Sequence, residues 1–255
     1  MTVKYSTVEL AGLATASVTR AELAQIMVED CFRRKRFKSA PKLVFSLNGQ
    51  GVSLVGQSVK FAEAMNEADI VHADGQSVVF ASRLLSNRGL PERVATTDFF
   101  HDAAEAAQAN GLSFFMLGGS EAENRRACEN IAAMYPSLRV VGRKHGYFSE
   151  EEEDGVIELI NSAKPDVLWV ALGKPKQEFW CVRLKNRVDV GWVKTCGGLY
   201  SFLSGNSPRA PRWMQAAGLE WLHRVCCAPR RLFWRYFITN PHSLYVLFFK
   251  SNRLK

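Results

Sequence analysis

Ile70-Val71-His72-Ala73-Asp74-Gly75 is a short apolar run that ends in an acid and a glycine. A carboxylate at the carboxyl end of a strand stands where an open α/β sheet places its catalytic and ligand-binding groups. Asp74 is therefore the first candidate for a catalytic residue. Taken alone, the same pair is equally typical of a turn acid or a helix cap, so the rest of the chain has to decide between these interpretations.

Further short apolar runs recur along the chain, and each has the length and composition of a buried strand. Segments with helical spacing separate them. One begins with a capping-box pattern, Ser149 followed by Glu152, and another starts after Ser120 and stops before Pro136. Because strands that alternate with helices pair in parallel, we expect a Rossmann-like α/β catalytic domain with a layered, mostly parallel sheet over residues 1–208. The predicted strands are residues 42–47, 68–72, 112–117, 138–141, 166–172 and 190–196.

The positive charge of the chain is concentrated at its end. Residues 209–255 hold nine of the 33 basic residues but only one, Glu220, of the 25 acidic residues. The remainder balances at 24 of each, so the formal net charge of +8 lies entirely in this segment. A basic segment of this kind suits nucleic acid, anionic lipid or a phosphorylated substrate.

Aromatic and aliphatic residues lie among these charges, which favours lipid or phosphate. Polar residues interrupt the apolar runs, so no stretch approaches the roughly 20 apolar residues of a spanning helix. We therefore predict a basic, aromatic-rich helical appendage, residues 209–255, that associates with a membrane surface. The alternative is an amphipathic helix docked on the body of the protein with its cations in water. The apolar residues are Leu232, Phe233, Trp234, Tyr236, Phe237, Ile238 and residues 244–249.

The amino-terminal stretch mixes acidic and basic residues with short apolar runs, which is not the pattern of a signal peptide, so we expect a cytoplasmic location. The six cysteines show no paired metal-ligand spacing, and the adjacent Cys226-Cys227 is not a zinc signature. The five histidines are scattered. We expect reduced, mostly buried cysteines and no metal site.

Two pairs of glycines, Gly118-Gly119 and Gly197-Gly198, each follow a predicted strand and precede a predicted helix. Backbone amides at such a place can hold phosphate. Neither pair completes a dinucleotide or phosphate-loop fingerprint, so a standard nicotinamide or ATP site is not indicated. Singly, each pair is typical of a tight turn, but a nucleotide site becomes the better interpretation if both lie at one edge of one sheet.

The stretch Gly173-Lys174-Pro175-Lys176-Gln177-Glu178 has the same placement after a predicted strand. Pro175 suits the first turn of the helix that follows. The amide of Gln177 offers both a donor and an acceptor and could bind a uracil or a sugar edge. A plain polar helix start is the equally good structural alternative.

The chain resembles the WecG/TagA/CpsF family of bacterial glycosyltransferases over residues 43–237, with the family's motifs in the family's order. These motifs are Ala73-Asp74-Gly75, Pro91-Glu92-Arg93-Val94, Phe115-Met116-Leu117-Gly118-Gly119, Gly146-Tyr147-Phe148, Pro165-Asp166, Leu172-Gly173-Lys174-Pro175-Lys176-Gln177-Glu178, Arg209-Ala210-Pro211 and Gly218-Leu219-Glu220-Trp221.

The resemblance implies transfer of a sugar from a UDP-sugar to a polyprenyl-diphosphate-linked saccharide, in the synthesis of surface polysaccharide or teichoic acid. It implies an inverting enzyme without metal or other cofactor, bound peripherally to the anionic inner face of the cell membrane. Nucleic acid is not an expected partner, and a homo-oligomer is left open. By resemblance, Asp74 matches the catalytic base, Arg93 an active-site arginine, Asn48 a donor-pocket asparagine and Gln177 a donor-side glutamine.

Chemistry agrees with this assignment. Inversion needs one base to take the proton of the acceptor hydroxyl, and a carboxylate such as Asp74 can serve. Without a metal, arginines and backbone amides must stabilise the negative charge that develops on the leaving UDP. The C-terminal arginines resemble an appendage that reaches over the site and toward the membrane. Sequence spacing does not choose among these candidates for the diphosphate or the membrane, which are Arg224, Arg230, Arg231 and Arg235.

Several positions depart from the family pattern. Ser46 replaces a threonine, Gly49-Gln50-Gly51 a proline or alanine with an acid, Thr96-Thr97-Asp98 a Gly-Ser/Thr-Asp, and Ser201 an aspartate. Since several lie at expected donor or acceptor contacts, N-acetylmannosamine is not assumed, and glucose, glucuronic acid and N-acetylglucosamine remain open as the sugar. The rival hypotheses are a noncatalytic nucleotide- or nucleic-acid-binding protein and an oxidoreductase, which the missing glycine fingerprint disfavours.

Overall fold

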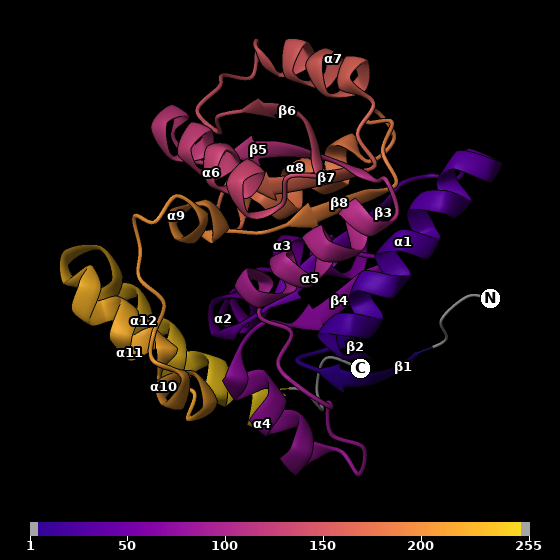
Figure 1. Cartoon of the computed structure of the whole chain (residues 1–255). Helices are drawn as coiled ribbons and strands as arrows, with labels where there is room; N and C mark the ends of the chain where they lie inside the picture. Colours follow the sequence, from indigo (N-terminus) through magenta and orange to yellow (C-terminus); the bar gives the residue numbers. More distant parts are fainter. Residues whose placement is uncertain (1–4, 251–255) are drawn as a thin grey trace.

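The computed structural model describes residues 5–250 and contains an eight-stranded sheet with helices on both faces (Figure 1). All six predicted strands are present: β3 has the predicted ends, and the ends of the other five differ by one to three residues from the predicted ones. The strands are β1 (Ser6–Leu10), β2 (Leu13–Ser17), β3 (Lys42–Leu47), β4 (Ile70–Ala73), β5 (Ser113–Gly118), β6 (Arg139–Lys144), β7 (Val167–Ala171) and β8 (Trp192–Thr195).

The strands lie in the order β1-β2-β4-β3-β8-β7-β5-β6, and every pairing except β1 with β2 is parallel. The expected α/β class with a mostly parallel sheet is therefore confirmed. The antiparallel β1–β2 hairpin was not predicted. Its turn uses Ala11 (φ 54°) and Gly12 (φ 74°), and alanine at a left-handed position carries none of the Asn-Gly or Asp-Gly signal by which such hairpins are recognised.

Of the two helices predicted from a cap, one begins where expected and the other begins later. Helix α6 begins directly after Ser120, whose side chain accepts from the amide of Glu123, and it ends before Pro136. The helix expected after Ser149 instead begins at Glu153, and only half of its capping box forms, because the Glu152 carboxylate accepts from the Ser149 amide. The helices are α1 (Arg20–Phe37), α2 (Gly49–Gln57), α3 (Val59–Asn66), α4 (Gln76–Leu85), α5 (Thr96–Ala109), α6 (Glu121–Met134), α7 (Glu153–Ala163), α8 (Lys176–Leu184), α9 (Leu199–Leu203), α10 (Arg212–Ala216), α11 (Glu220–Cys227) and α12 (Pro229–Tyr245), followed by a π-helical turn, η1 (Val246–Lys250).

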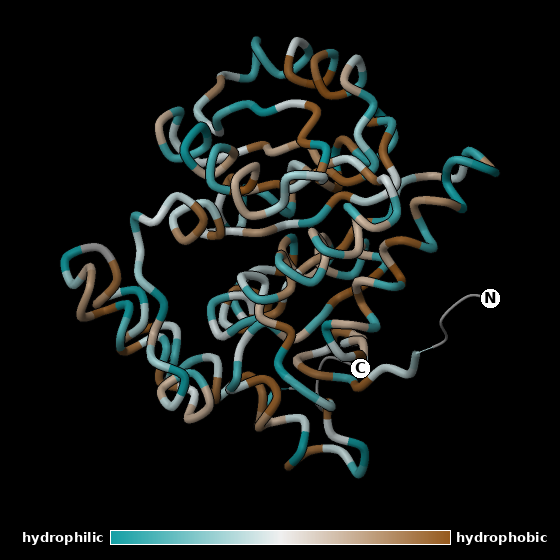
Figure 2. The backbone as a smooth tube through the Cα atoms, in the orientation of Figure 1, coloured by the Kyte–Doolittle hydropathy of each residue, from teal (hydrophilic) through white to brown (hydrophobic). Residues whose placement is uncertain are grey.

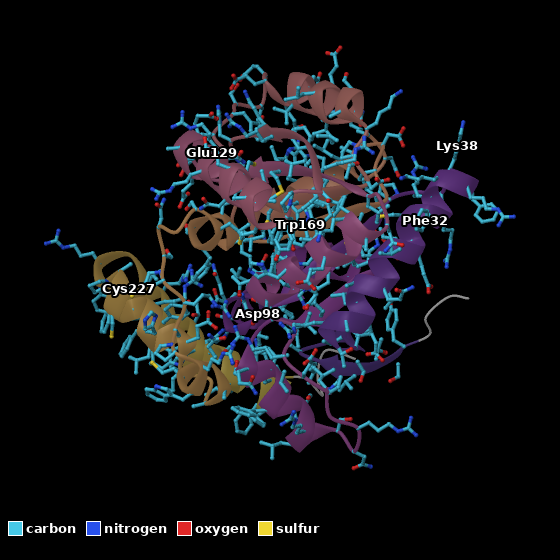
Figure 3. The ribbon with its side chains drawn as sticks, viewed as in Figure 1. Phe32, Lys38, Asp98, Glu129, Trp169 and Cys227 are labelled. Atoms are coloured by element: carbon cyan, nitrogen blue, oxygen red, sulfur yellow. The ribbon has the colours of Figure 1, made fainter. Side chains whose placement is uncertain are left out.

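The core has two layers, one on each face of the sheet. Helices α1, α5, α6 and α9 cover one face, and α2, α3, α4, α7 and α8 supply the apolar residues of the other. Trp169 of β7 is fully buried in the first layer, at the centre of the molecule in Figure 3. The sheet is thus covered on both sides, and its strand ends are the part left to build a site.

The C-terminal helices α10 to α12 lie to one side of the sheet and mix hydrophilic with hydrophobic residues along their length (Figures 1 and 2). Helix α12 packs against α2, where His242 Nδ1 lies 3.0 Å from Ser53 Oγ. Val246 and Leu247 of η1 are fully buried in the core beside α2. The division of the chain at residue 208 stays a prediction. Within residues 5–250, no helix is both long and apolar enough to cross a bilayer.

Three of the six cysteines, Cys31, Cys181 and Cys196, are buried, and all six are free thiols. Cys128 is half-buried, whereas Cys226 and Cys227 are exposed on α11. The expectation of mostly buried cysteines therefore holds for residues 5–208 but not for the C-terminal helices.

Candidate functional site

The predicted catalytic and donor-side residues follow five parallel strands at one edge of the sheet. Asn48 follows β3 and Asp74 follows β4, while Gly118 ends β5. Gln177 lies in the segment after β7, and Gly197 lies after β8. Because the carboxyl ends of parallel strands meet at one edge, the structure brings both glycine pairs together, which is the condition set above for a nucleotide site.

Asp74 is held by donors from two neighbouring elements. Its Oδ1 accepts from the amide of Thr96, the first residue of α5, at 2.7 Å, and its Oδ2 accepts from Asn48 Nδ2 at 3.1 Å. Asn48 also caps α2, since its Oδ1 accepts from the Gly51 amide. Gly75 allows this approach, because a Cβ there would lie 3.1 Å from the Asn48 Cα. Asp74 is half-buried and keeps lone pairs for a substrate hydroxyl.

The surroundings of Asp74 keep it ionised. Burial raises the pKa of this carboxyl, but the Arg93 guanidinium, the Thr96 amide and the Asn48 side chain lower it to about 2. The carboxylate is therefore charged at neutral pH and can accept a proton but not supply one.

A chain of ion pairs connects Asp74 to the C-terminal segment. The Nε of Arg93 donates to the backbone carbonyl of Asp74 at 2.8 Å, and its Nη2 lies 2.6 Å from Glu220 of α11. Glu220 also lies 3.4 Å from Arg209, which in turn pairs with Asp98 at 2.7 Å. Both groups of the central Arg93–Glu220 pair are more than four-fifths buried. The segment after residue 208 is thus fixed to the site through charge.

Gln177 and its neighbours lie under the second glycine pair. Gln177 is fully buried, and its Oε1 accepts from the Gly197 amide at 3.1 Å while its Nε2 donates to Glu178 at 2.8 Å. Lys174 closes the network by donating to Glu178 at 2.7 Å and to the Ser46 carbonyl at 2.8 Å. The side-chain amide of Gln177 is therefore occupied inside the protein, where it fixes the position of the Gly197 amide.

The first glycine pair makes a tight turn against β7. Gly118 has φ +125°, and a Cβ there would lie 2.3 Å from the Ala171 carbonyl oxygen, so only glycine fits. Gly119 has φ +68° and its carbonyl accepts from the Gly146 amide at 2.8 Å. Gly118, Gly119 and Gly146 of the predicted motifs therefore meet at this point of the edge, where they present backbone groups and no side chains.

Among the four predicted C-terminal arginines, Arg224 lies at the second glycine pair. A Cβ on Gly198 would be 3.4 Å from Arg224 Nη2, and the Arg224 guanidinium lies 5.4 Å from the centre of the Phe202 ring. Arg235 instead packs over Tyr236 of its own helix at 4.7 Å, and Arg230 is exposed. The side chain of Arg231 lies outside the described part of the structure.

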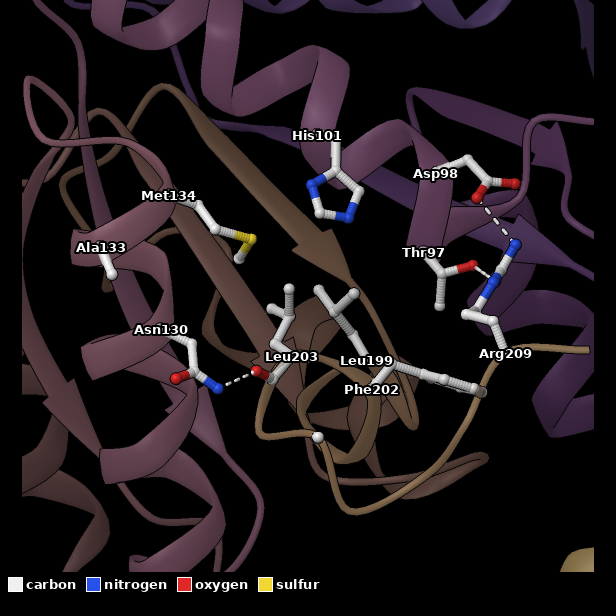
Figure 4. Close-up of a pocket in the computed structure, with 11 residues that line it drawn as sticks. Thr97, Asp98, His101, Asn130, Ala133, Met134, Leu199, Phe202, Leu203 and Arg209 are labelled. Carbon is white, nitrogen blue, oxygen red and sulfur yellow. Dashed lines mark hydrogen bonds and ion pairs between the residues drawn. The ribbon is translucent and has the colours of Figure 1, made fainter.

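A cavity of about 490 Å³ lies beside the site, between α5, α6 and α9. Figure 4 shows Arg209 at its rim, bonded to Thr97 and Asp98, and Leu199 and Leu203 along its wall. The cavity starts one residue beyond Thr96, which donates to Asp74. Its apolar wall and polar rim have the composition of a small-molecule pocket.

Two buried titratable groups that the sequence did not single out lie under the site. Lys194 of β8 and His72 of β4 are both fully buried. The Lys194 Nζ donates to the Thr195 carbonyl at 2.6 Å, and burial lowers its pKa to about 8. Burial, together with the ammonium of Lys194, holds the pKa of His72 well below its usual range. His72 is therefore neutral, and Lys194 is a cation held at a cost in stability.

We expect Lys194→Met to raise the free energy of unfolding at pH 7 by on the order of 1–3 kcal/mol, because it removes a desolvated ammonium. The stability advantage of the variant over the wild-type protein should shrink as the pH rises. Between the folded pKa of about 8 and the unfolded value of 10.5, folded wild-type protein releases the proton first, so wild-type stability rises relative to the variant. Urea unfolding of both proteins from pH 7 to 9.5 measures this, with the exposed Lys60→Met as control; a constant difference would contradict it.

Within residues 5–250, no group of three or more His, Cys, Asp or Glu side chains is arranged to hold a metal ion. Among the residues described above, Lys194 and Glu123 were not singled out from the sequence. Thr96, Lys174, Glu220 and Ser201 were quoted only within the resembling motifs or among the departures from the family pattern, without a role of their own.

The chain is similar to known proteins over most of its length. The family model described as "Glycosyl transferase WecG/TagA/CpsF family" matches residues 8–255. Two curated relatives both bear the name N-acetylglucosaminyldiphosphoundecaprenol N-acetyl-beta-D-mannosaminyltransferase. The Bacillus subtilis protein is 29% identical over 214 residues, covering 80% of this chain and 82% of its own length. The Bacillus spizizenii protein is 28% identical over 185 residues, covering 72% and 70%.

Proposed function

The chain belongs to the WecG/TagA/CpsF family of glycosyl transferases, and from this premise we propose that it moves a sugar from a UDP-sugar to a polyprenyl-diphosphate-linked saccharide with inversion. The observation that carries the proposal is the carboxylate of Asp74, fixed by Asn48 and Thr96 at the edge where both glycine pairs meet. The family is an enzyme family, which disfavours the noncatalytic binding protein and the oxidoreductase.

The reaction needs one base and one group that stabilises the negative charge developing on the leaving UDP. Asp74 takes the proton of the acceptor hydroxyl while the oxygen of that hydroxyl bonds to the anomeric carbon of the donor sugar. The bond from the anomeric carbon to the diphosphate oxygen breaks at the same time. The electron pair leaves with UDP. Both relatives are named for a β-linked product, and an α-linked UDP-sugar gives a β-linked product by inversion, so one displacement with one base is sufficient.

The diphosphate is placed toward the second glycine pair. The Gly197 amide is already used by Gln177, so the charge on the leaving group is left to guanidinium groups. Arg224 lies against Gly198 and is half-buried, which makes its charge effective. Arg93 is engaged by Glu220 and the Asp74 carbonyl, so we assign it to positioning Asp74 and α11.

Helix α12 supplies the surface for a membrane. Its exposed side chains include large aromatics beside cations, the composition of an interfacial helix. The apolar members of this α12 surface are Phe233, Trp234, Phe237 and Ile238, which are 47%, 66%, 62% and 59% exposed, and Arg230 lies with them. We propose that this surface meets the anionic inner face of the cell membrane, where a lipid-linked acceptor is held.

We expect the double variant Trp234→Ser and Phe237→Ser to bind vesicles that contain anionic phospholipid at least about 10-fold more weakly, since each aromatic side chain loses roughly 1.5–3 kcal/mol of burial. Cosedimentation with vesicles measures this. The matched control is Phe37→Ser, because Phe37 is 66% exposed at the far end of α1, away from α12 (Figure 1). Equal losses in both proteins would show that binding is not directed by α12.

The function is tested by release of UDP from a panel of UDP-sugars, with detergent-solubilised polyprenyl-diphosphate-N-acetylglucosamine as acceptor. Turnover with one donor that depends on the acceptor would support the proposal and name the sugar. The relatives' names point to N-acetylmannosamine as the first donor to try, although Ser46 and Ser201 depart from the family pattern. Absence of turnover with every donor, in protein that binds the acceptor, would refute it.

A further inference from the structure

Glu123 and Ser201 connect the helices that follow the two glycine pairs. Ser201 Oγ, on α9 after Gly197-Gly198, donates to Glu123 Oε1, on α6 after Gly118-Gly119, at 2.6 Å. Both side chains are half-buried. This one hydrogen bond thus bridges the two loops that are expected to hold the donor nucleotide, and it leaves a carboxylate between them.

The carboxylate of Glu123 does not make the capping interaction that its position in the helix predicts. Glu123 is the third residue of α6, where a glutamate commonly reaches back to the amide of the capping residue, here Ser120. Its amide does donate to Ser120 Oγ at 3.2 Å, but its carboxylate accepts from Ser201. The second oxygen, Oε2, points along the loop, because a Cβ on Gly119 would lie 3.6 Å from it.

Within the described part of the chain, no cation lies at ion-pairing distance from this carboxylate. A partly desolvated carboxylate without a cation is costly unless hydroxyl or amide donors satisfy it. Ser201 supplies one such donor to Oε1, and Oε2 lies beside Gly119 of the glycine loop. A vicinal diol matches this carboxylate in chemistry, since a carboxylate accepts from both of its hydroxyls.

The negative charge of the Glu123 carboxylate also favours one orientation of a bound nucleoside diphosphate, with the ribose rather than the diphosphate beside it. It repels phosphate, so the diphosphate must lie away from Gly119, and the Arg224 guanidinium lies beside Gly198, in the other glycine pair.

We infer that Glu123, oriented by Ser201, binds the ribose hydroxyls of the donor nucleotide and sets its direction, with the ribose at Gly119 and the diphosphate at Arg224. The inference rests on the proposed UDP-sugar donor. Glu123 is on this view a donor-specificity residue, and Ser201 is the positioning residue that fixes its carboxylate.

Titration calorimetry of the purified protein with UDP, 2′-deoxy-UDP and 3′-deoxy-UDP tests it. Wild-type protein should bind at least one deoxy analogue about 10-fold or more weakly than UDP, as expected for loss of a hydrogen bond to a charged group. Glu123→Gln should weaken UDP by about 10- to 100-fold and bring the ratio of the UDP and deoxy affinities close to one. Ser201→Ala should reduce the same ratio by a smaller factor.

The matched control is Glu129→Gln, which changes an exposed glutamate on the same helix and should leave all three affinities unchanged. If Glu123→Gln does not fold, Ser201→Ala carries the test. A wild-type protein that binds UDP and both analogues equally, or a Glu123→Gln protein that keeps the wild-type ratio, overturns the inference while the UDP donor stands. A wild-type protein that binds no UDP overturns the proposed donor and this inference together.

Discussion

Asp74→Asn should lower kcat by about 10²- to 10⁴-fold and leave the affinity for UDP nearly unchanged. The amide cannot take the proton of the acceptor hydroxyl, while the glycine loops and Arg224 that hold the nucleotide are untouched. Single-turnover transfer with saturating donor and acceptor measures the chemical step, and calorimetry with UDP measures binding. A variant that loses donor affinity but transfers at the normal rate would remove Asp74 from the role of base.

The control for this experiment is the same substitution at Asp69, the aspartate at the opposite end of β4 from Asp74. Asp69 lies just before β4, at the other edge of the sheet, and its carboxylate accepts from Lys42, Lys185 and the Leu43 amide. Those partners lower its pKa against the effect of burial. Asp69→Asn should therefore cost stability without a specific loss of kcat, which separates damage to the fold from damage to the chemistry.

The low pKa of Asp74 also constrains the pH profile. Because this pKa is about 2 in the free protein, the acid limb of kcat/KM above pH 4 should not belong to Asp74. The same shift contributes stability that is complete above the unfolded value of 3.8 and is lost as pH falls toward 2. A base this weak gives less proton-transfer driving force than one near neutrality, so its contribution should fall toward the lower end of the range given above.

The sequence predicts those elements whose residue pattern lies within one short segment of the chain. The strands were readable because buried parallel strands are continuous apolar runs, and α6 because Ser120 caps it within four residues. The β1–β2 hairpin was missed because Ala11 adopts a left-handed conformation that alanine does not announce. Asp74 was found for a topological reason, since any residue after a parallel strand lies at the same edge, whereas Asn48 was found only through the resemblance to the family.

The rest of the site depends on contacts between distant segments. Lys194 looks like part of an apolar run, and only the fold shows that it is buried on the same face as His72. Glu123 and Ser201 are 78 positions apart, and nothing local marks them as partners. The choice of Arg224 among the C-terminal arginines likewise needed the position of α11, which the Arg93–Glu220 pair fixes.

Arg224→Ala should lower kcat by about 10²- to 10³-fold, the usual cost of removing one donor from a developing anion. The group lies at Gly198 and over Phe202, in a half-buried place where its charge is poorly screened. Arg224→Lys should recover only part of the loss, because an ammonium neither spans two phosphate oxygens nor stacks on the phenyl ring as a guanidinium does.

The control must separate this role from the general positive charge of the C-terminal segment. Arg212 is exposed on α10, so Arg212→Ala removes the same charge from the same segment without reaching the glycine loop. Transfer to a detergent-solubilised acceptor should then continue in Arg212→Ala at close to the wild-type rate. If both variants lost activity equally, and 1 M salt reduced the wild-type rate to the same degree, the arginines would act through long-range attraction of the anionic substrates. A loss confined to Arg224 that salt does not reproduce would instead place its guanidinium on the leaving diphosphate.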